Sequence, residues 1–326
     1  MKILITGCAG FIGYHIAHKL IKSKHDIVGI DNINDYYDVN LKIDRLKELK
    51  SLGLKFKFKK LDLSNYSKLK DIFKLNEFDI VYHLAAQAGV RDSVSNPKKY
   101  FKDNIQSYFN ILECVKLFNI KHFIFASSSS VYGNNSKIPY DESQNINNPE
   151  SFYAASKSTN ELMARSYSNI YGIKMTGLRF FTVYGPFGRP DMALYNFTKN
   201  IFNKRQIKVF NYGHHKRDFI YIKDVVILLE KLILRSPKNR SIFEVYNVGN
   251  NKPIKLLDFI NIISKTIRIK PKIKYIKKQI GDVAITHADS SKAFKHYGFS
   301  SETKLEEGIY HFIEWYKKYN NISDGK

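Results

Sequence analysis

The chain has 326 residues, of which 44% are hydrophobic, and its formal net charge is +23. This length is enough for a large core in two lobes, and no apolar run is long enough to indicate a membrane-spanning helix. Two cysteines, Cys8 and Cys114, are too few for a disulfide framework or a cysteine-based metal site, which favours a reducing, cytoplasmic compartment. Lysine greatly outnumbers arginine and is dispersed, so we expect no nucleic-acid partner. We also expect no membrane insertion and no bound metal. The charge instead favours an anionic substrate.

Short apolar runs alternate with amphipathic segments over the first half of the chain. The predicted strands lie at 2–6, 26–31, 56–63, 78–86, 121–128 and 175–181. The predicted helices lie at 11–23, 64–75, 96–119 and 152–171, the second of them capped by Ser64. This repeated alternation predicts an α/β fold with a doubly wound parallel sheet, the Rossmann arrangement.

The regular alternation breaks after residue 181. The segments that follow are a loop at 182–193, a helix, the segment 207–224, another helix, the segment 246–251 and an amphipathic closing helix at 307–319. We therefore predict a first, dinucleotide-binding domain over 1–181. A smaller C-terminal α/β lobe over 182–326 would bind the substrate and return some segments to the first domain.

A glycine-rich turn joins the first predicted strand to the first predicted helix. In "GCAGFIG", Gly7 permits a tight turn, Gly10 lets the backbone approach a pyrophosphate, and Gly13 lets the helix pack on the strand. The helix N-terminus would then face the phosphates. Asp31 ends the second strand, 18 residues after Gly13. It can accept hydrogen bonds from both ribose hydroxyls and would repel a 2′-phosphate, so the pattern predicts NAD rather than NADP. Asp62 either meets the adenine edge or is solvated.

A Tyr-x-x-x-Lys pair lies at Tyr153 and Lys157, on one face of a predicted helix. The chain contains four such pairs, and chance placement predicts roughly three, so the spacing alone carries little information. Position makes the difference, because Ser128 lies at the carboxyl end of the strand at 121–128, where open α/β sheets bind ligands. Ser128, Tyr153 and Lys157 are therefore the predicted catalytic residues.

These three side chains predict proton and hydride chemistry at a sugar hydroxyl. Tyr153 would remove the hydroxyl proton while hydride leaves the same carbon for NAD, and Ser128 would hold the reacting oxygen. Because free tyrosine has a pKa of about 10, we expect the Lys157 ammonium and the positive nicotinamide to lower the pKa of Tyr153.

Several stretches together resemble the extended short-chain dehydrogenase/reductase family, and within its nucleotide-sugar branch the UDP-glucuronate 4-epimerases. They are "DNINDYYDVNLK" (31–42), "HLAAQAGVR" (83–91), "ASSSSVYG" (126–133), "GLRFFTVYGPFGRPDMA" (177–193), "RDFIYIKD" (217–224) and "GDVAITHAD" (281–289). The resemblance covers essentially the whole chain. It implies C4 epimerisation of UDP-glucuronate to UDP-galacturonate, a step in polysaccharide biosynthesis, through a 4-keto intermediate.

The resemblance also implies the binding residues. Those expected around NAD are Gly7, Gly10, Phe11, Ile12, Gly13, Asp31, Asn32, Asp62, Leu63, Ala85, Asn104, Tyr153 and Lys157. Those expected around the UDP-sugar are Ser128, Ser129, Ser130, Tyr153, Thr182, Arg189, Arg217 and Asp282. It further implies a homodimer through the helices at 96–119 and 152–171. Arg91 either approaches the substrate or pairs at the surface.

Neighbouring branches of the family differ at a few positions. The 4,6-dehydratases carry Asp-Glu where this chain has Ser129 and Ser130, and UDP-xylose-forming decarboxylases carry Glu at the Ser130 position. UDP-glucose 4-epimerases carry Asn in place of Thr182 and Arg in place of Gln279. Our hypothesis is that the hydroxyls of Ser129, Ser130 and Thr182 hold the uronate carboxylate and fix its orientation.

Alternative functions stay open at this point. Within enzymes they are a UDP-glucose or UDP-N-acetylglucosamine 4-epimerase and a UDP-glucuronate decarboxylase. From another class, the chain could be a non-catalytic NAD-binding sensor.

Overall fold

The centre of the protein is a seven-stranded, fully parallel sheet with the order β10-β6-β5-β4-β1-β2-β3. This computed structural model describes residues 1–135, 137–234, 242–279 and 282–323. The strands are β1 (Lys2–Thr6), β2 (Asp26–Asp31), β3 (Phe56–Lys60), β4 (Ile80–His83), β5 (His122–Ser128), β6 (Met175–Phe180) and β10 (Phe243–Val248). The order reverses between β1 and β4, which places a crevice at their carboxyl ends. The predicted doubly wound fold is confirmed.

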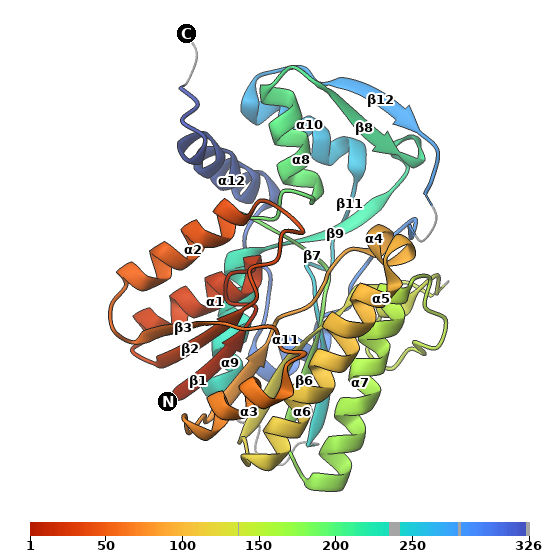
Figure 1. The fold of residues 1–326 in the computed structure, drawn as a ribbon. Coiled ribbons are helices and arrows are strands. Elements are labelled where there is room, and N and C mark those ends of the chain that lie inside the picture. Colours follow the sequence, from red (N-terminus) through yellow and green to blue (C-terminus); the bar gives the residue numbers. More distant parts are fainter. Residues whose placement is uncertain (136, 235–241, 280–281, 324–326) are drawn as a thin grey trace.

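Helices cover both faces of this sheet because its strands are buried on both sides (Figure 1). One face packs against α1 (Phe11–Lys22), α2 (Val39–Ser51), α9 (Ile222–Leu234) and α11 (Ser291–Tyr297). The other packs against α3 (Tyr66–Lys74), α6 (Ser107–Leu117) and α7 (Phe152–Tyr171). Successive residues of β1 alternate between the two layers, since Ile3 and Ile5 join the first cluster of buried side chains and Leu4 joins the second.

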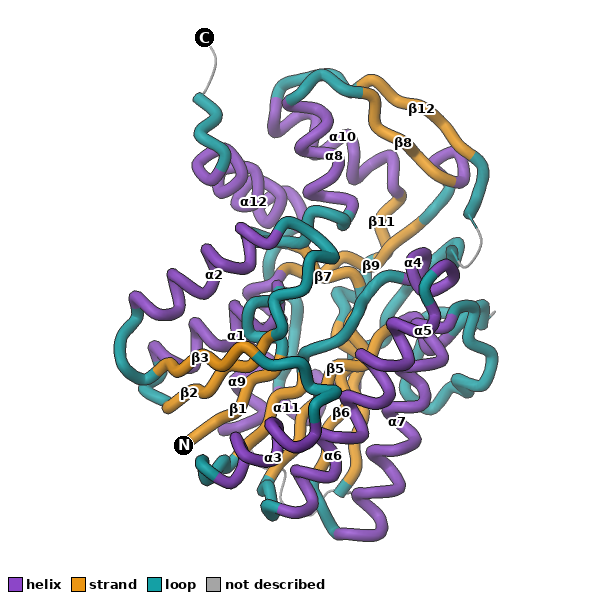
Figure 2. The backbone as a smooth tube through the Cα atoms, viewed as in Figure 1, coloured by secondary structure: helices purple, strands orange, loops and turns teal. Residues whose placement is uncertain are grey.

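The C-terminal lobe lies beyond the carboxyl ends of the sheet (Figure 2). A three-stranded sheet has the order β11-β9-β7, and β8 pairs with β12 in a separate parallel ribbon. These strands are β7 (Thr182–Tyr184), β8 (Gln206–Phe210), β9 (Lys216–Tyr221), β11 (Pro253–Lys255) and β12 (Lys272–Ile276). The lobe's helices are α8 (Ala193–Phe202), η3 (Asn211–Gly213), α10 (Leu256–Ile267) and α12 (Leu305–Tyr319). Its buried side chains continue the first cluster, so the lobe and the α1 layer share one core.

Three local predictions need correction or refinement, and one helix was missed. The expected helix at 96–119 consists of α5 (Pro97–Tyr100), the π-helical segment η1 (Phe101–Gln106) and α6. Helix α3 is capped by Asn65, which accepts from the backbone N–H of Lys68, and not by Ser64. The stretch expected as a loop at 182–193 begins with strand β7, and helix α2 was not predicted. The domain boundary after residue 181 stays a prediction; α9 and β10, which follow it, belong to the central layers.

No described helix has the length and apolar character that crossing a membrane would require. Among the described residues, no group of three or more His, Cys, Asp and Glu side chains is arranged to hold a metal ion. Cys8 and Cys114 are buried free thiols, and burial raises the pKa of each.

Candidate active site

A cavity of about 470 Å³ lies at the carboxyl edge of the central sheet, between the sheet and the C-terminal lobe. Its lining includes every predicted site residue except Asn104. The cavity is thus formed by the turns after β1, β2, β4 and β5, the start of α7 and the segments around β7 and β9. This is where an open α/β sheet is expected to bind its ligand.

The glycine-rich turn forms one wall, and its glycines are sterically required. Gly7 has a φ of +71°, and a Cβ there would lie 2.7 Å from the backbone nitrogen of Ala85. At Gly13 a Cβ would lie 2.1 Å from the carbonyl oxygen of Gly7. Helix α1 begins after Gly10, which offers no side-chain cap, so the first N–H groups of the helix remain available to phosphate. Phe11 and Ile12 line the same wall.

Replacing Gly13 with Ala should therefore weaken cofactor binding and lower the free energy of unfolding by about 1–3 kcal/mol, because the new methyl group collides with backbone. Gly172→Ala is a matched control, since Gly172 has a φ of +65° but no atom of the described residues lies within 4 Å of the position that a Cβ would take. Its substitution should cost only about 1–2 kcal/mol of backbone strain and leave NAD affinity unchanged. Thermal unfolding and NAD titration would measure both effects. Equal NAD affinity of the Gly13→Ala variant and the wild type would contradict the expectation.

Asp31 occupies the end of β2 and lines the cavity beside Asn32. Its Oδ2 accepts from the backbone N–H of Ala9 (3.1 Å) and its Oδ1 from that of Ile33 (2.9 Å). Burial raises the pKa of Asp31, and the Lys42 ammonium acts in the opposite direction. The carboxylate is thus oriented by the turn that forms the phosphate wall. It fits a ribose diol and opposes a 2′-phosphate.

Asp62, Leu63 and Ala85, three more of the residues expected around NAD, also line the cavity. Asp62 forms a salt bridge of 2.7 Å with Lys102, which contributes to lowering the pKa of the carboxyl group. Asn104 is the one predicted site residue behind the wall. Its Oδ1 accepts from the backbone N–H of Gln87 (2.7 Å), and its Nδ2 donates to the Gln87 carbonyl (3.0 Å), so Asn104 shapes the wall through Gln87. Direct contact between Asn104 and NAD stays a prediction.

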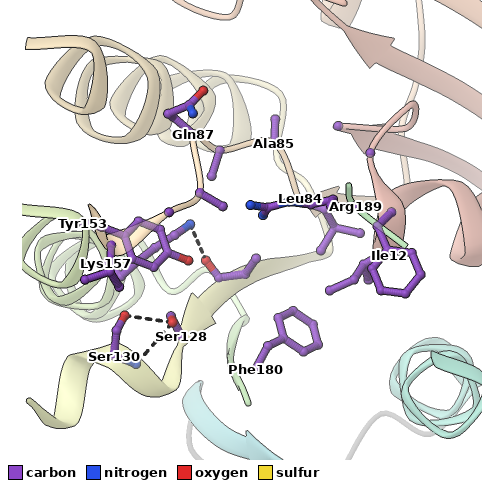
Figure 3. A pocket seen from close by; sticks show the side chains of 18 of the residues that line it. Ile12, Leu84, Ala85, Gln87, Ser128, Ser130, Tyr153, Lys157, Phe180 and Arg189 are labelled. Atoms are coloured by element: carbon purple, nitrogen blue, oxygen red, sulfur yellow. Dashed lines mark hydrogen bonds between the residues drawn. The ribbon is translucent and has the colours of Figure 1, made fainter. Parts of the chain in front are cut away.

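The predicted catalytic side chains come together at the opposite end of the cavity. Ser151 caps α7 by accepting from the N–H of Ala154, which places Tyr153 in the first turn. Lys157 lies one turn later, and its Nζ donates to the Ala126 carbonyl on β5 (2.9 Å). Figure 3 shows the polar ends of Tyr153 and Lys157 turned toward the same space, near Ser128.

The direction of the pKa shift of Tyr153 differs from the sequence-based expectation. Burial raises the pKa of Tyr153, and the contributions that lower it come from the hydrogen bond with Ser128 and from the Arg189 guanidinium. The expected lowering by Lys157 is not among them. Burial also lowers the pKa of Lys157 to about 8, because charged groups are poorly solvated there.

A cluster of hydroxyl groups lies beside Tyr153. Ser128 caps the short helix η2 (Ser129–Tyr132), and its Oγ accepts from the backbone N–H (3.2 Å) and the Oγ (2.8 Å) of Ser130. Ser129 and Thr182 line the same part of the cavity. The sharp turn of η2 after β5 therefore gathers polar donors without introducing a carboxylate.

Three predicted charged residues line the side of the cavity formed by the C-terminal lobe. Arg189 pairs with Asp191 through two hydrogen bonds of 3.0 and 2.5 Å and reaches toward the catalytic end (Figure 3). The Nη1 of Arg217 donates to the carbonyls of Lys216 (3.0 Å) and Ala284 (3.1 Å).

The third of them, Asp282, pairs with Arg91 at 2.9 Å. The Arg91 guanidinium also lies 4.3 Å from the ring centre of Phe210. Arg91 does not itself line the cavity, although its partner Asp282 does, and approach to the substrate and pairing at the surface both stay predictions.

Sequence reasoning missed several lining residues, among them Tyr36, Lys42 and Gln87. The side chain of Lys42 is buried, and its Nζ donates to the backbone carbonyl and the Oδ1 of Asn34, at 2.6 Å each. Tyr36 and Lys42 lie in the stretch 31–42, which supports the family resemblance as a whole. That stretch has no hydrophobic periodicity that would single out individual residues. Gln87 has a comparable signal in 83–91.

Comparison with known proteins agrees with this geometry. The family model described as "NAD dependent epimerase/dehydratase family" matches residues 3–249. The chain is 47% identical to Protein CapI of Staphylococcus aureus, over 98% of this chain and 99% of that protein. It is 40% identical to the UDP-glucuronate 4-epimerase of Thermodesulfobacterium geofontis, over 97% of this chain and 96% of that protein.

A solved structure gives the same result in three dimensions. The UDP-glucuronic acid 4-epimerase of Bacillus cereus, in complex with UDP-glucuronic acid and NAD, superposes with a TM-score of 0.91 at 32% identity. The match covers 98% of this chain and all of that one. With the glycine wall, Asp31 and the Ser-Tyr-Lys cluster in one cavity, these matches show that the chain belongs to the NAD dependent epimerase/dehydratase family.

Proposed function

We propose that this protein is an NAD-dependent isomerase that epimerises C4 of UDP-glucuronate to give UDP-galacturonate. The observation that carries the proposal is the convergence of Ser128, Tyr153 and Lys157 on a cavity whose other end has a pyrophosphate-binding turn and a carboxylate suited to ribose. Similarity to UDP-glucuronate 4-epimerases over nearly the whole chain supports the same reaction. The intact Ser-Tyr-Lys set disfavours a non-catalytic sensor.

The cofactor is NAD, which when bound supplies the acceptor and donor of hydride at C4. Tyr153 is the proposed base that takes the proton of the 4-hydroxyl and later returns one. Its anion is stabilised by the Ser128 hydroxyl and by the charge of Arg189, the two contributions that oppose burial. Ser128 also holds the reacting oxygen within reach of Tyr153. With NAD bound, hydride would return to the opposite face of C4 after the sugar has turned, while Tyr153 returns a proton to the C4 oxygen, so C4 would be inverted without net oxidation.

Inversion requires that the nucleotide stays bound while the sugar turns. Arg217 and Arg189 line the cavity with positive charge, and burial lowers the pKa of Arg217 without depriving it of its proton at neutral pH. We assign Arg217 and Asp282 to the nucleotide diphosphate or the sugar, and Arg189 to the substrate site. Fixed cations at this position would hold the diphosphate as the pivot of the rotation.

The uronate carboxylate needs control because oxidation at C4 makes the sugar a β-keto acid, which loses CO2 when the carboxylate bond aligns with the carbonyl π system. The neighbouring hydroxyls of Ser129, Ser130 and Thr182 are suited to donate to that carboxylate and fix its plane. A carboxylate at these positions would repel the uronate. The segment 127–130 contributes only serines to the lining of the cavity and no carboxylate. This favours the uronate over neutral sugars and epimerisation over decarboxylation.

Incubation of the purified protein with UDP-glucuronate, UDP-glucose and UDP-N-acetylglucosamine separately, followed by chromatography, tests the substrate. We expect UDP-galacturonate from the first at a kcat/KM at least about 100-fold above the others, because the others lack the charged group that the site is built to hold. The amount of NAD should stay constant during turnover. UDP-pentose as the main product would support the decarboxylase alternative, and preference for UDP-glucose would support the neutral-sugar epimerase.

We further propose a homodimer formed by η1, α6 and α7, in the cytoplasm. Large apolar side chains exposed on these helices are Phe101, Phe109, Leu117, Leu162, Ile170 and Tyr171. Phe109 is 45% exposed, and its ring lies 6.5 Å from that of Tyr167 on α7, edge to face. Pairing of two such helix layers would remove this apolar surface from water.

Phe109→Glu should raise the dimer dissociation constant by about 100-fold or more, since an unpaired carboxylate would be buried in the interface. Sedimentation velocity or light scattering after gel filtration would measure it. Leu54→Glu is the matched control, because Leu54 is 97% exposed in the turn after α2 and away from these helices. A wild type that is monomeric at every concentration, or equal dimerisation of the Phe109 variant, would contradict the proposal.

A further inference from the structure

A buried ion pair lies directly behind the catalytic side chains. The Arg179 guanidinium on β6 donates to both oxygens of Glu161 on α7, from Nε to Oε1 (2.9 Å) and from Nη2 to Oε2 (2.7 Å). Each side chain is 5% exposed. The hydroxyl of Ser127 on β5 donates to the same Oε1 at 2.5 Å. The carboxylate is therefore held from two strands in the bidentate geometry that gives strong, oriented hydrogen bonds.

This carboxylate is linked to the catalytic residues through both the helix and the strand. Glu161 follows Lys157 by four residues on α7, so the two side chains share a helix face. Lys157 binds the carbonyl of Ala126, and Glu161 binds the hydroxyl of Ser127, the next residue along β5. Helix α7 is thus fastened to β5 at two successive residues immediately before Ser128.

We propose that Glu161 is a positioning residue: held by Ser127 and Arg179, its carboxylate keeps Lys157 protonated at the working pH and fixes the catalytic face of α7 against the end of β5. This proposal depends on the proposed function only where its test measures turnover of UDP-glucuronate. Glu161 does not line the cavity that contains Tyr153, so it acts through Lys157 and Ser127 and not by touching substrate.

The balance of charge around Lys157 explains why such a partner is needed. Lys157 is 2% exposed, and burial lowers its pKa to about 8, while Glu161 acts to raise it. His83 on β4 adds no second positive charge, because burial lowers its pKa to about 3 and leaves it neutral. The other titratable or charged groups near this cluster are Tyr153 on α7, Tyr108 on α6, Arg179 on β6 and Arg189 after β7. Among these described groups, Glu161 supplies the negative charge at neutral pH.

The far side of the ion pair is also fixed. The Nη1 of Arg179 donates to the hydroxyl of Tyr132 (2.9 Å), which donates to Oδ1 of Asn247 on β10 (2.7 Å). Asn247 in turn donates to the carbonyls of Tyr140 (2.8 Å) and Asp289 (3.0 Å). Arg179 therefore cannot follow Glu161 if the helix shifts, and the carboxylate keeps one position relative to Lys157.

The decisive variant is Glu161→Gln, which keeps the size of the side chain and removes its charge. Lys157 should then lose its proton at lower pH, so the alkaline limb of the pH profile of kcat should move down by about one unit. Near pH 6.5, where Lys157 stays protonated, most activity should remain. The pH at which the dissociation constant of NAD begins to rise should shift in the same direction, because Lys157 lines the NAD cavity. That second measurement needs no turnover, so it remains decisive if UDP-glucuronate is not the substrate.

Two comparisons separate charge from structure. Glu161→Asp keeps the charge but shortens its reach, so kcat should fall while the alkaline limb stays in place; this variant also serves if the Gln variant does not fold. Asp224→Asn is the matched control, since Asp224 is 3% exposed, accepts from Ser301 and Thr303, and does not line the cavity. It should lower the melting temperature without moving either pH profile. An equal loss at every pH in the Gln variant, or unshifted profiles for both kcat and NAD binding, would overturn the proposal.

Discussion

Replacing Tyr153 with Phe should lower kcat by about 1,000-fold or more while leaving the fold and NAD binding intact. The variant loses only the hydroxyl that exchanges the proton of the 4-hydroxyl group, and general acid–base catalysis of this kind contributes roughly 100- to 10,000-fold. The ring itself packs edge to face against Tyr100, with centroids 6.2 Å apart, and this contact does not need the hydroxyl. Product formation from UDP-glucuronate, thermal unfolding and NAD titration would measure the three quantities.

Tyr195→Phe provides the control for that experiment. Tyr195 and Lys199 form another of the four Tyr-x-x-x-Lys pairs, on helix α8, and Tyr195 does not line the catalytic cavity. It packs against the aromatic side chains of α12, including Tyr316 at 5.2 Å between ring centres. Its substitution should change kcat by less than about twofold. Near-normal turnover by the Tyr153→Phe variant would show that Tyr153 is not the catalytic base, whatever the result for the control.

Ser130→Glu should lower kcat/KM for UDP-glucuronate by about 1,000-fold or divert the product to a UDP-pentose. Two carboxylates about 4 Å apart repel by about 4 kcal/mol at the effective dielectric of a partly buried site, which corresponds to roughly that factor. The new side chain would also remove the hydrogen bond from the Ser130 hydroxyl to Ser128. Any uronate that still binds would be displaced from its fixed orientation, and loss of CO2 from the 4-keto intermediate would compete with the return of hydride.

Ser130→Gln separates charge from bulk, because it adds nearly the same volume without the negative charge. We expect it to retain at least about tenfold more activity than the Glu variant, with UDP-galacturonate still the product. Chromatography of the products with a CO2 assay would distinguish the two. If the Glu variant had the rate and product of the wild type, the hydroxyl cluster would have no part in recognising the carboxylate.

The sequence predicted six of the seven strands of the central sheet, because most of them are short apolar runs, and it predicted the cofactor turn from its glycines. Strand β10 was not predicted as a strand. Gly7 and Gly13 could be assigned from spacing alone, and at each of them a Cβ atom would collide with nearby backbone atoms. Helix α2 was not predicted because its buried face includes Lys42 and Arg45, whose charged ends donate to backbone carbonyls outside the helix, those of Asn34 and Ala9. Nothing in a hydrophobic pattern signals a buried cation whose partner, such as the carbonyl of Phe187, lies far along the chain.

The same reason limits what the sequence could say about the site. The Ser-Tyr-Lys set was recognisable from its place after a strand, but the pKa of Tyr153 depends on burial and on Arg189, which the fold brings in from beyond β7. No sequence pattern indicated that the side chain of Asn104 binds the backbone of Gln87. The Glu161–Arg179 pair joins a helix to a strand through side chains that are unremarkable one at a time, so only the packed structure identifies it.

Strand β10 has a consequence for how the protein is made in the cell. It reaches the edge of the main sheet only after the chain has passed through β7, α8, β8 and β9 of the C-terminal lobe. It pairs with β6 along its whole length, from Phe243 opposite Met175 to Val248 opposite Phe180. A ribosome that has released only the first 181 residues therefore exposes β6 as an unpaired edge of apolar residues. Such an edge invites strand addition from other nascent chains. We expect truncated products that end before β10 to aggregate, and co-translational chaperones to bind the chain during this interval.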